Sequence, residues 1–207
     1  THLMKINSLG TEKVPTADVA IMIALARAAE IRIIGPSSVG IMSPGKLKIG
    51  SIGSGGIASR IFTPGYVGVV SKSGGMTAEL SRILTDAGLG QSTVLGIGGD
   101  LLCGSDFVDI AKLSEVAAAA GIPVILDGTV TTPYLFRSKD FGVAVEVLSS
   151  TKYMSGGATT VGGLIIDTGN QDWSKCPGLA KAAAKYGPHA LLARLRRETF
   201  RNLGACM

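Results

Sequence analysis

Short apolar runs that end in glycine, serine or aspartate alternate along the chain with longer stretches of helical pattern. Apolar runs between turn residues are typical of buried strands, and the stretches between them are typical of helices. Strands separated by helices favour βαβ units with right-handed crossovers. The sequence therefore predicts an α/β fold of three layers, a mostly parallel sheet with helices on both faces. The predicted strands are 31–35, 67–73, 93–99, 123–129, 143–150 and 161–169, with a weaker one at 5–9, and the predicted helices are 14–29, 76–87, 107–120 and 187–203.

A stretch rich in glycine and serine interrupts this alternation between residues 36 and 65. It is long for a loop, so we expect it to contain a short strand pair or to be partly mobile. No repeat and no linker of distinct composition divides the chain, which favours a single domain, 1–207, with one half at 1–110 and the other at 111–207. The first four residues are interpreted as a cloning remnant.

Hydrophobic residues make up 46% of the sequence and charged residues 17%, which is typical of a globular protein. The formal net charge is +5, and a positive excess is typical of proteins with acidic partners. Part of it lies on the predicted C-terminal helix, without stacking aromatic residues or a nucleic-acid motif. We therefore expect a solvated helix face and no nucleic-acid partner. The arginines concerned are Arg194, Arg196, Arg197 and Arg201.

Targeting signals and metal-binding spacings are absent from the sequence. There is no signal peptide and no apolar run of about 18 residues, so we expect no membrane partner and a cytoplasmic location. The three cysteines, Cys103, Cys176 and Cys206, are odd in number and form no CxxC pair. This spacing predicts neither a disulfide framework nor a zinc site, and no other metal site is predicted. The oligomeric state stays open.

A turn of small residues in the first half follows an apolar run and opens a predicted helix. Free N–H groups and the helix dipole at such a turn favour an anion. Ser71, Ser73, Gly74 and Gly75 are therefore candidate phosphate-binding residues, with phosphate or another small anion as the partner. The alternative is an ordinary turn, since many α/β proteins have serine and glycine at this place.

Three long motifs surround that turn, IGPSSVGIMSPGKLKIG, PGYVGVVSKSGGMTAEL and GLGQSTVLGIGGDLLCGSDFVDI. Together they make residues 12–110 resemble the second, flavodoxin-like domain of succinyl-CoA synthetase α-subunits. In that family the SKSG-type turn places a helix N-terminus against a phosphorylated histidine, which lies in a GHAG-type motif. This sequence has no such motif, and its histidines are His2 and His189. The resemblance thus implies that the turn can bind phosphate but that the chain does not catalyse the ligase reaction.

The second half carries different motifs, among them LSEVAAAAGIPVILDGTVTTPYL and VEVLSSTKYMSGGATTVGGLIIDTG. They make residues 111–207 resemble O-acetylhomoserine sulfhydrylases of the pyridoxal-phosphate (PLP) dependent Cys/Met-metabolism family. The resemblance implies that Lys152 is the Schiff-base amine and that Asp127 keeps the pyridinium nitrogen protonated. It also implies that the hydroxyls of Ser149 and Thr151 bind the phosphate. Without the resemblance, Lys152 would be a solvated lysine and Asp127 a turn residue.

Two positions beside these motifs bear on the acid–base chemistry. Gly128 stands where the family often has Asn, and Glu146 lies within a predicted buried strand. We expect Glu146 to pair with a neighbour rather than to act as a catalytic acid.

The two resemblances meet near residues 109–113, on a predicted helix that both families would have there. We interpret the chain as an engineered flavodoxin-like/PLP-transferase hybrid, with a natural fusion as the alternative. Both parental sites are incomplete in it, so we expect a structural scaffold with no native catalysis and no required cofactor. The competing hypothesis is a weak PLP or phosphate binder, in which the 71–75 turn and Lys152 gather at the carboxyl ends of the strands.

Overall fold

The chain folds into two compact units, Thr1–Val108 and Asp109–Met207. The boundary lies two residues before the one predicted between the two halves. The computed structural model describes residues 2–5, 16–53, 56, 58–99, 102–156 and 159–200. The prediction that residues 1–207 form a single domain that unfolds cooperatively stays a prediction.

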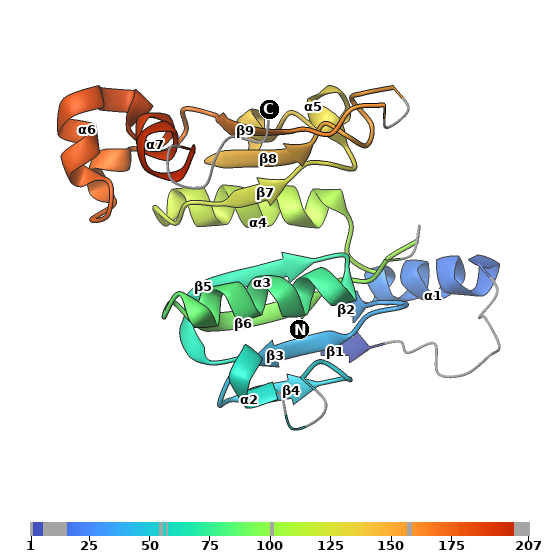
Figure 1. Ribbon diagram of the computed structural model, residues 1–207. Helices are drawn as coiled ribbons and strands as arrows, with labels where there is room; N and C mark the ends of the chain where they lie inside the picture. The colour runs from blue at the N-terminus through green and yellow to red at the C-terminus, as the bar shows by residue number, and fades with distance from the viewer. Residues whose placement is uncertain are drawn as a thin grey trace. The chain divides into compact units, whose positions relative to one another are not determined.

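The first unit contains two small sheets (Figure 1). Strands β1 and β2 pair in parallel, and a second sheet has the order β4-β3-β6-β5, in which β5 and β6 are parallel and β3 is antiparallel to both of its neighbours. Its elements are β1 (His2–Lys5), α1 (Thr16–Ala28), β2 (Ile31–Ile34), β3 (Gly40–Ser43), β4 (Leu47–Ile49), α2 (Ala58–Ile61), β5 (Pro64–Ser71), α3 (Gly74–Asp86) and β6 (Gln91–Gly96).

Apolar burial and one buried amide hold this second sheet to α3. The core contains Met42, Ile52, Phe62, Val69 and Val94. The Gln91 side chain, 1% exposed, donates to the Ser81 carbonyl at 2.7 Å and to Thr85 Oγ1 at 3.0 Å, and it accepts from the Thr63 N–H at 3.2 Å. Because the oxygen and the nitrogen of the Gln91 amide both have hydrogen-bond partners, burying this side chain leaves no polar atom unsatisfied.

The second unit is built on a three-stranded sheet of order β7-β8-β9, with β7 and β8 parallel and β9 antiparallel to β8. One face of β8 packs on Trp173 and Ala190 through Val145 and Val147. The Trp173 indole N–H donates to Asp167 Oδ2 at 2.7 Å. The elements are α4 (Phe107–Ala119), β7 (Ile125–Asp127), α5 (Thr132–Leu135), η1 (Ser138–Phe141), β8 (Val145–Ser149), β9 (Gly163–Asp167), η2 (Trp173–Lys175), α6 (Ala180–Tyr186), η3 (Gly187–His189), α7 (Ala190–Arg194) and η4 (Leu195–Phe200).

The fold class is mixed α/β, but a mostly parallel three-layer sheet is not confirmed. Among the described strands, three pairings are parallel and three are antiparallel. The reason lies in the connections, since parallel strands need a long crossover while antiparallel ones do not. The 44–46 turn reverses the chain between β3 and β4, and this hairpin confirms the strand pair expected within 36–65. No helix is described in the β8–β9 connection either.

The predicted C-terminal helix 187–203 is helical throughout its described part, 187–200, but not as one regular α-helix. The described part is a 3₁₀ turn, a short α-helix and a π-helical segment. Gly187 has a φ of +57°, and Pro188 follows it within the 3₁₀ turn. Residues 201–203 of the prediction lie outside the described residues.

Candidate functional site

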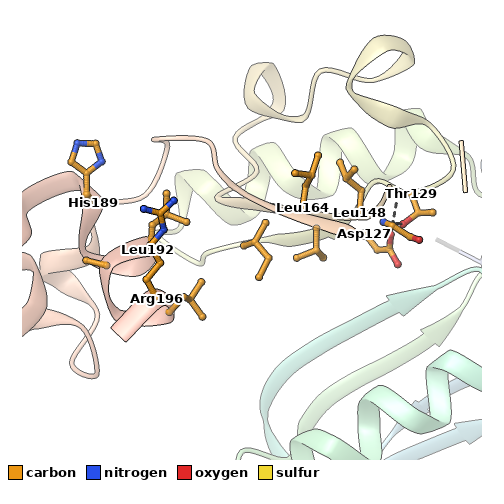
Figure 2. Close-up of a pocket in the computed structure, with 13 residues that line it drawn as sticks. Asp127, Thr129, Leu148, Leu164, His189, Leu192 and Arg196 are labelled. Atoms are coloured by element: carbon orange, nitrogen blue, oxygen red, sulfur yellow. Dashed lines mark hydrogen bonds between the residues drawn. The ribbon is translucent and has the colours of Figure 1, made fainter. Parts of the chain in front are cut away.

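A hollow of about 840 Å³ lies within the second unit (Figure 2). Register places Asp127, Val147 and Ile165 side by side on one face of the sheet, and all three line the hollow. The opposite wall comes from η3, α7 and η4. That wall consists of His189, Leu192, Ala193, Leu195 and Arg196.

Asp127 and Ser149 lie at the same end of the sheet, because β7 and β8 are parallel and end there. Asp127 Oδ1 accepts a hydrogen bond from the Thr129 N–H at 3.0 Å, which closes a tight turn after β7. Thr129 Oγ1 in turn accepts from the Ser149 N–H at 2.9 Å. Through Thr129 the turn therefore connects Asp127 at the end of β7 to Ser149 at the end of β8. The side chains of Asp127 and Ser149 both line the hollow.

Lys152 and Thr151 lie in the turn beyond β8 and do not line the hollow. Thr151 Oγ1 donates to the Gly162 carbonyl at 3.2 Å and accepts from the Gly162 N–H at 2.8 Å. The Lys152 side chain is exposed, and it makes no hydrogen bond or ion pair with any described residue. Of the predicted PLP residues, the structure thus brings Asp127 and Ser149 together and leaves the lysine on a neighbouring turn.

Glu146 is 3% exposed and lies on the opposite face of β8. Its Oε2 accepts from the Ser138 hydroxyl at 2.6 Å, which agrees with the expectation that this acid pairs with a neighbour. Its Oε1 has no hydrogen-bond partner among the described residues. A Cβ added at Gly128 would stand 2.1 Å from that oxygen. The absence of a side chain at Gly128 therefore makes room for the buried carboxylate.

The small-residue turn of the first unit uses its hydroxyls locally. Ser71 Oγ donates to the Ser73 carbonyl at 3.0 Å and accepts from the Ser73 N–H at 3.1 Å. Ser73 is the N-cap of α3, and its Oγ accepts from the Met76 N–H at 3.3 Å. Phosphate binding at Ser71, Ser73, Gly74 and Gly75 stays a prediction, for which the glycine N–H groups are the remaining local donors.

Replacing Ser73 with alanine is expected to destabilise the first unit by about 1 kcal/mol, because an N-terminal N–H of α3 loses its acceptor. Urea unfolding followed by circular dichroism measures this. Ser73→Asp keeps a capping acceptor and serves as the matched control. Equal stability of Ser73→Ala and the unchanged protein would show that the cap contributes nothing.

Sequence reasoning missed the helical wall of the hollow. The sequence places Arg196 on a solvated helix face and gives His189 no role, since neither residue carries a motif. Their spacing of seven residues, close to two helical turns, is the available signal, but it does not say which sheet the segment packs against.

The described residues offer neither a metal site nor a membrane span. No group of three or more histidine, cysteine, aspartate or glutamate side chains is placed to hold a metal ion there. None of the helices described has the length and apolar character that crossing a membrane needs. Cys103 and Cys176 form no disulfide with any described residue, and Cys206 lies outside the described residues.

Comparison with known proteins separates the two halves. A profile of the Cys/Met metabolism PLP-dependent enzymes matches residues 104–193. The N-terminal half is similar to the succinate–CoA ligase (ADP-forming) α-subunit 2 of Archaeoglobus fulgidus, 45% identical over 51% of this chain and 35% of the relative. The Methanothermobacter thermautotrophicus α-subunit is 42% identical over 51% of this chain and 34% of its own. The chain thus spans about a third of the length of these relatives.

Two solved structures are also similar in part. O-acetylhomoserine sulfhydrylase of Wolinella succinogenes is 52% identical, with a TM-score of 0.41 over 46% of this chain and 27% of the other. ATP citrate lyase of Methanothrix soehngenii is 30% identical, with a TM-score of 0.49 over 65% of this chain and 22% of the other.

Proposed function

We propose a two-part function from the similarity of one segment of the chain to succinyl-CoA synthetase α-subunits and of another segment to PLP-dependent Cys/Met-metabolism enzymes. The chain is a hybrid scaffold that carries out neither parental reaction, and its second unit keeps a weak site for PLP. The observation that carries the proposal is that Asp127 and Ser149 line one hollow at the shared end of β7 and β8.

The residues of this hollow fit the cofactor in part. One oxygen of Asp127 is held by the Thr129 N–H, and the other accepts no hydrogen bond from any described residue, so it is available to a protonated ring nitrogen. The Ser149 hydroxyl is available to a phosphate oxygen. Bound there, PLP would supply an electron sink. The residues' own contribution is to orient the ring and to keep a positive charge beside Asp127.

Lys152 decides how strong the binding is. Its ammonium is exposed, and its flexible four-carbon stem must be ordered to reach the hollow, which costs side-chain entropy. Thr151 is engaged with Gly162 and does not line the hollow. We therefore expect a dissociation constant in the millimolar to high-micromolar range, worth about 4–6 kcal/mol.

We also infer that the two segments were joined by design. The predicted switch of family near residues 109–113 would lie on α4, next to the boundary between the compact units, so one continuous helix would serve both parents. A join at a shared helix preserves packing on either side. A natural gene that encodes both segments in one reading frame would contradict this inference.

Titration with PLP tests the proposed site. The visible absorbance of lysine-bound cofactor should rise with PLP in the unchanged protein and be lost in Lys152→Ala. Asp127→Asn should weaken binding by about tenfold, because the ring nitrogen loses a charge-assisted hydrogen bond. Lys139→Ala, which removes another exposed lysine of the same unit, is the matched control and should behave as the unchanged protein. An identical titration for Lys152→Ala would contradict the proposal.

A further inference from the structure

The hollow of the second unit has two chemically different ends. Figure 2 shows Asp127 and Thr129 at one end and His189 and Arg196 at the other. The first end is acidic and rich in hydroxyls, and the second carries a guanidinium and an imidazole. The wall between them is apolar and includes Val147, Ile165, Leu192 and Leu195.

Arg196 differs from Arg194 and Arg197 of its helical segment in having no partner among the residues that the structure describes. Arg194 Nε pairs with Glu198 Oε2 at 2.8 Å, and Arg197 donates to the Tyr186 hydroxyl at 3.4 Å. The hydrogen bond from Arg197 is also the main cause that lowers the pKa of Tyr186. Among the residues that the structure describes, none forms a hydrogen bond or ion pair with Arg196. Its planar guanidinium is therefore free to bind a carboxylate through two parallel hydrogen bonds.

The volume of the hollow and its lining residues indicate which kind of anion would bind at the Arg196 end. A volume of about 840 Å³ lies within the roughly 300–1,000 Å³ typical of small-molecule sites, whose walls are mainly apolar with a few oriented polar groups. An inorganic anion would leave the apolar wall uncovered. A carboxylate with an aliphatic tail covers it, since the tail can lie along Ile165 and Leu192.

The Asp127 carboxylate at the far end of the hollow determines how the ligand is oriented and how many charges it can carry. Asp127 repels a second carboxylate, so the ligand should carry its one charge at Arg196 and lay its tail along Ile165 toward Val147. We propose that this hollow binds aliphatic monocarboxylates, with the carboxylate on Arg196. The inference goes beyond the proposed cofactor site and does not depend on Lys152.

Octanoate is the probe that tests the proposal. Titration of the full chain, followed by NMR of methyl groups, should shift the signals of Ile165 and Leu192. Octan-1-ol, with the same tail and no charge, and octanedioate, with a second carboxylate for Asp127 to repel, should each bind at least about tenfold more weakly.

Variants assign the effect to one side chain. Arg196→Gln should weaken octanoate binding by about ten- to a hundredfold, the loss expected for a charge-assisted hydrogen bond. Arg197→Gln, one residue along and outside the hollow, is the matched control and should bind as the unchanged protein does. Lys152→Ala should also bind octanoate normally, so loss of the cofactor site and loss of this site are separable. Equal binding of octanol, an unaffected Arg196→Gln, or no shift at Ile165 and Leu192 would each overturn the proposal.

Discussion

Gly40→Ala is expected to lower the free energy of unfolding of the first unit by about 3–5 kcal/mol, through backbone strain and overpacking together. Gly40 has a φ of +106°, which side chains with a Cβ rarely adopt. An added Cβ would also stand 2.0 Å from the Ile49 carbonyl oxygen on the neighbouring strand. That oxygen belongs to the backbone of β4, so the overlap with the new methyl group is relieved only if β3 and β4 separate.

Urea unfolding followed by circular dichroism measures this loss. Gly75→Ala is the matched control, because nothing lies within 4 Å of a Cβ added there. A Gly40→Ala protein as stable as the Gly75→Ala control would show that β3 and β4 are not packed as described.

The same variant tests the single-domain prediction, because Trp173 is the one tryptophan in the sequence and lies in the second unit. Cooperative unfolding of residues 1–207 requires the fluorescence transition to shift with circular dichroism. A fluorescence midpoint that stays at the value of the unchanged protein would make the two units independent.

Gly128→Ala is expected to destabilise the second unit by about 1–3 kcal/mol, because the new methyl group overlaps the buried Glu146 carboxylate. The overlap involves Oε1 at 2.1 Å and Cδ at 2.9 Å. Glu146 cannot swing away freely, since Ser138 holds its other oxygen at 2.6 Å and the residue is 3% exposed. The variant should also weaken PLP binding, because Gly128 lies between Asp127 and Thr129 in the turn that orients the acid.

A double-mutant cycle isolates this contact. Glu146→Ala removes the overlapping atoms, so Gly128→Ala should cost about 1–2 kcal/mol less in that background. Glu146→Gln keeps the size of the side chain and should give little relief, which makes it the matched control. Additive losses in the Glu146→Ala background would show that the two residues do not collide.

The alternation of apolar runs and helical stretches predicted most of the strands within a few residues. The 123–129 run contains β7, and the 143–150 run contains β8. It could not predict strand direction, since the pattern along β9 is the same whether it runs parallel or antiparallel to β8. Direction depends on whether a helix forms in the connection, and no such helix is described between β8 and β9.

The candidate site was predictable only where strand order alone decides it. Asp127 and Ser149 line the same hollow because they are the last residues of two neighbouring parallel strands, β7 and β8. The position of Lys152 depends on the turn that follows β8, where Ser155 donates to the Thr151 carbonyl at 2.8 Å and Thr151 bonds to Gly162. Arg196 reaches the hollow through packing between segments far apart in sequence, which local pattern does not encode.

Mass-spectrometric mapping of PLP attachment tests the central claim most directly, that the second unit keeps a site built on Asp127 and Lys152. The full chain is incubated with PLP at a concentration near its dissociation constant, reduced with borohydride and digested. We expect one dominant modified peptide containing Lys152, and we expect its yield to fall in Asp127→Asn. Modification spread evenly over the exposed lysines, with Lys152 no more labelled than Lys139, would contradict it.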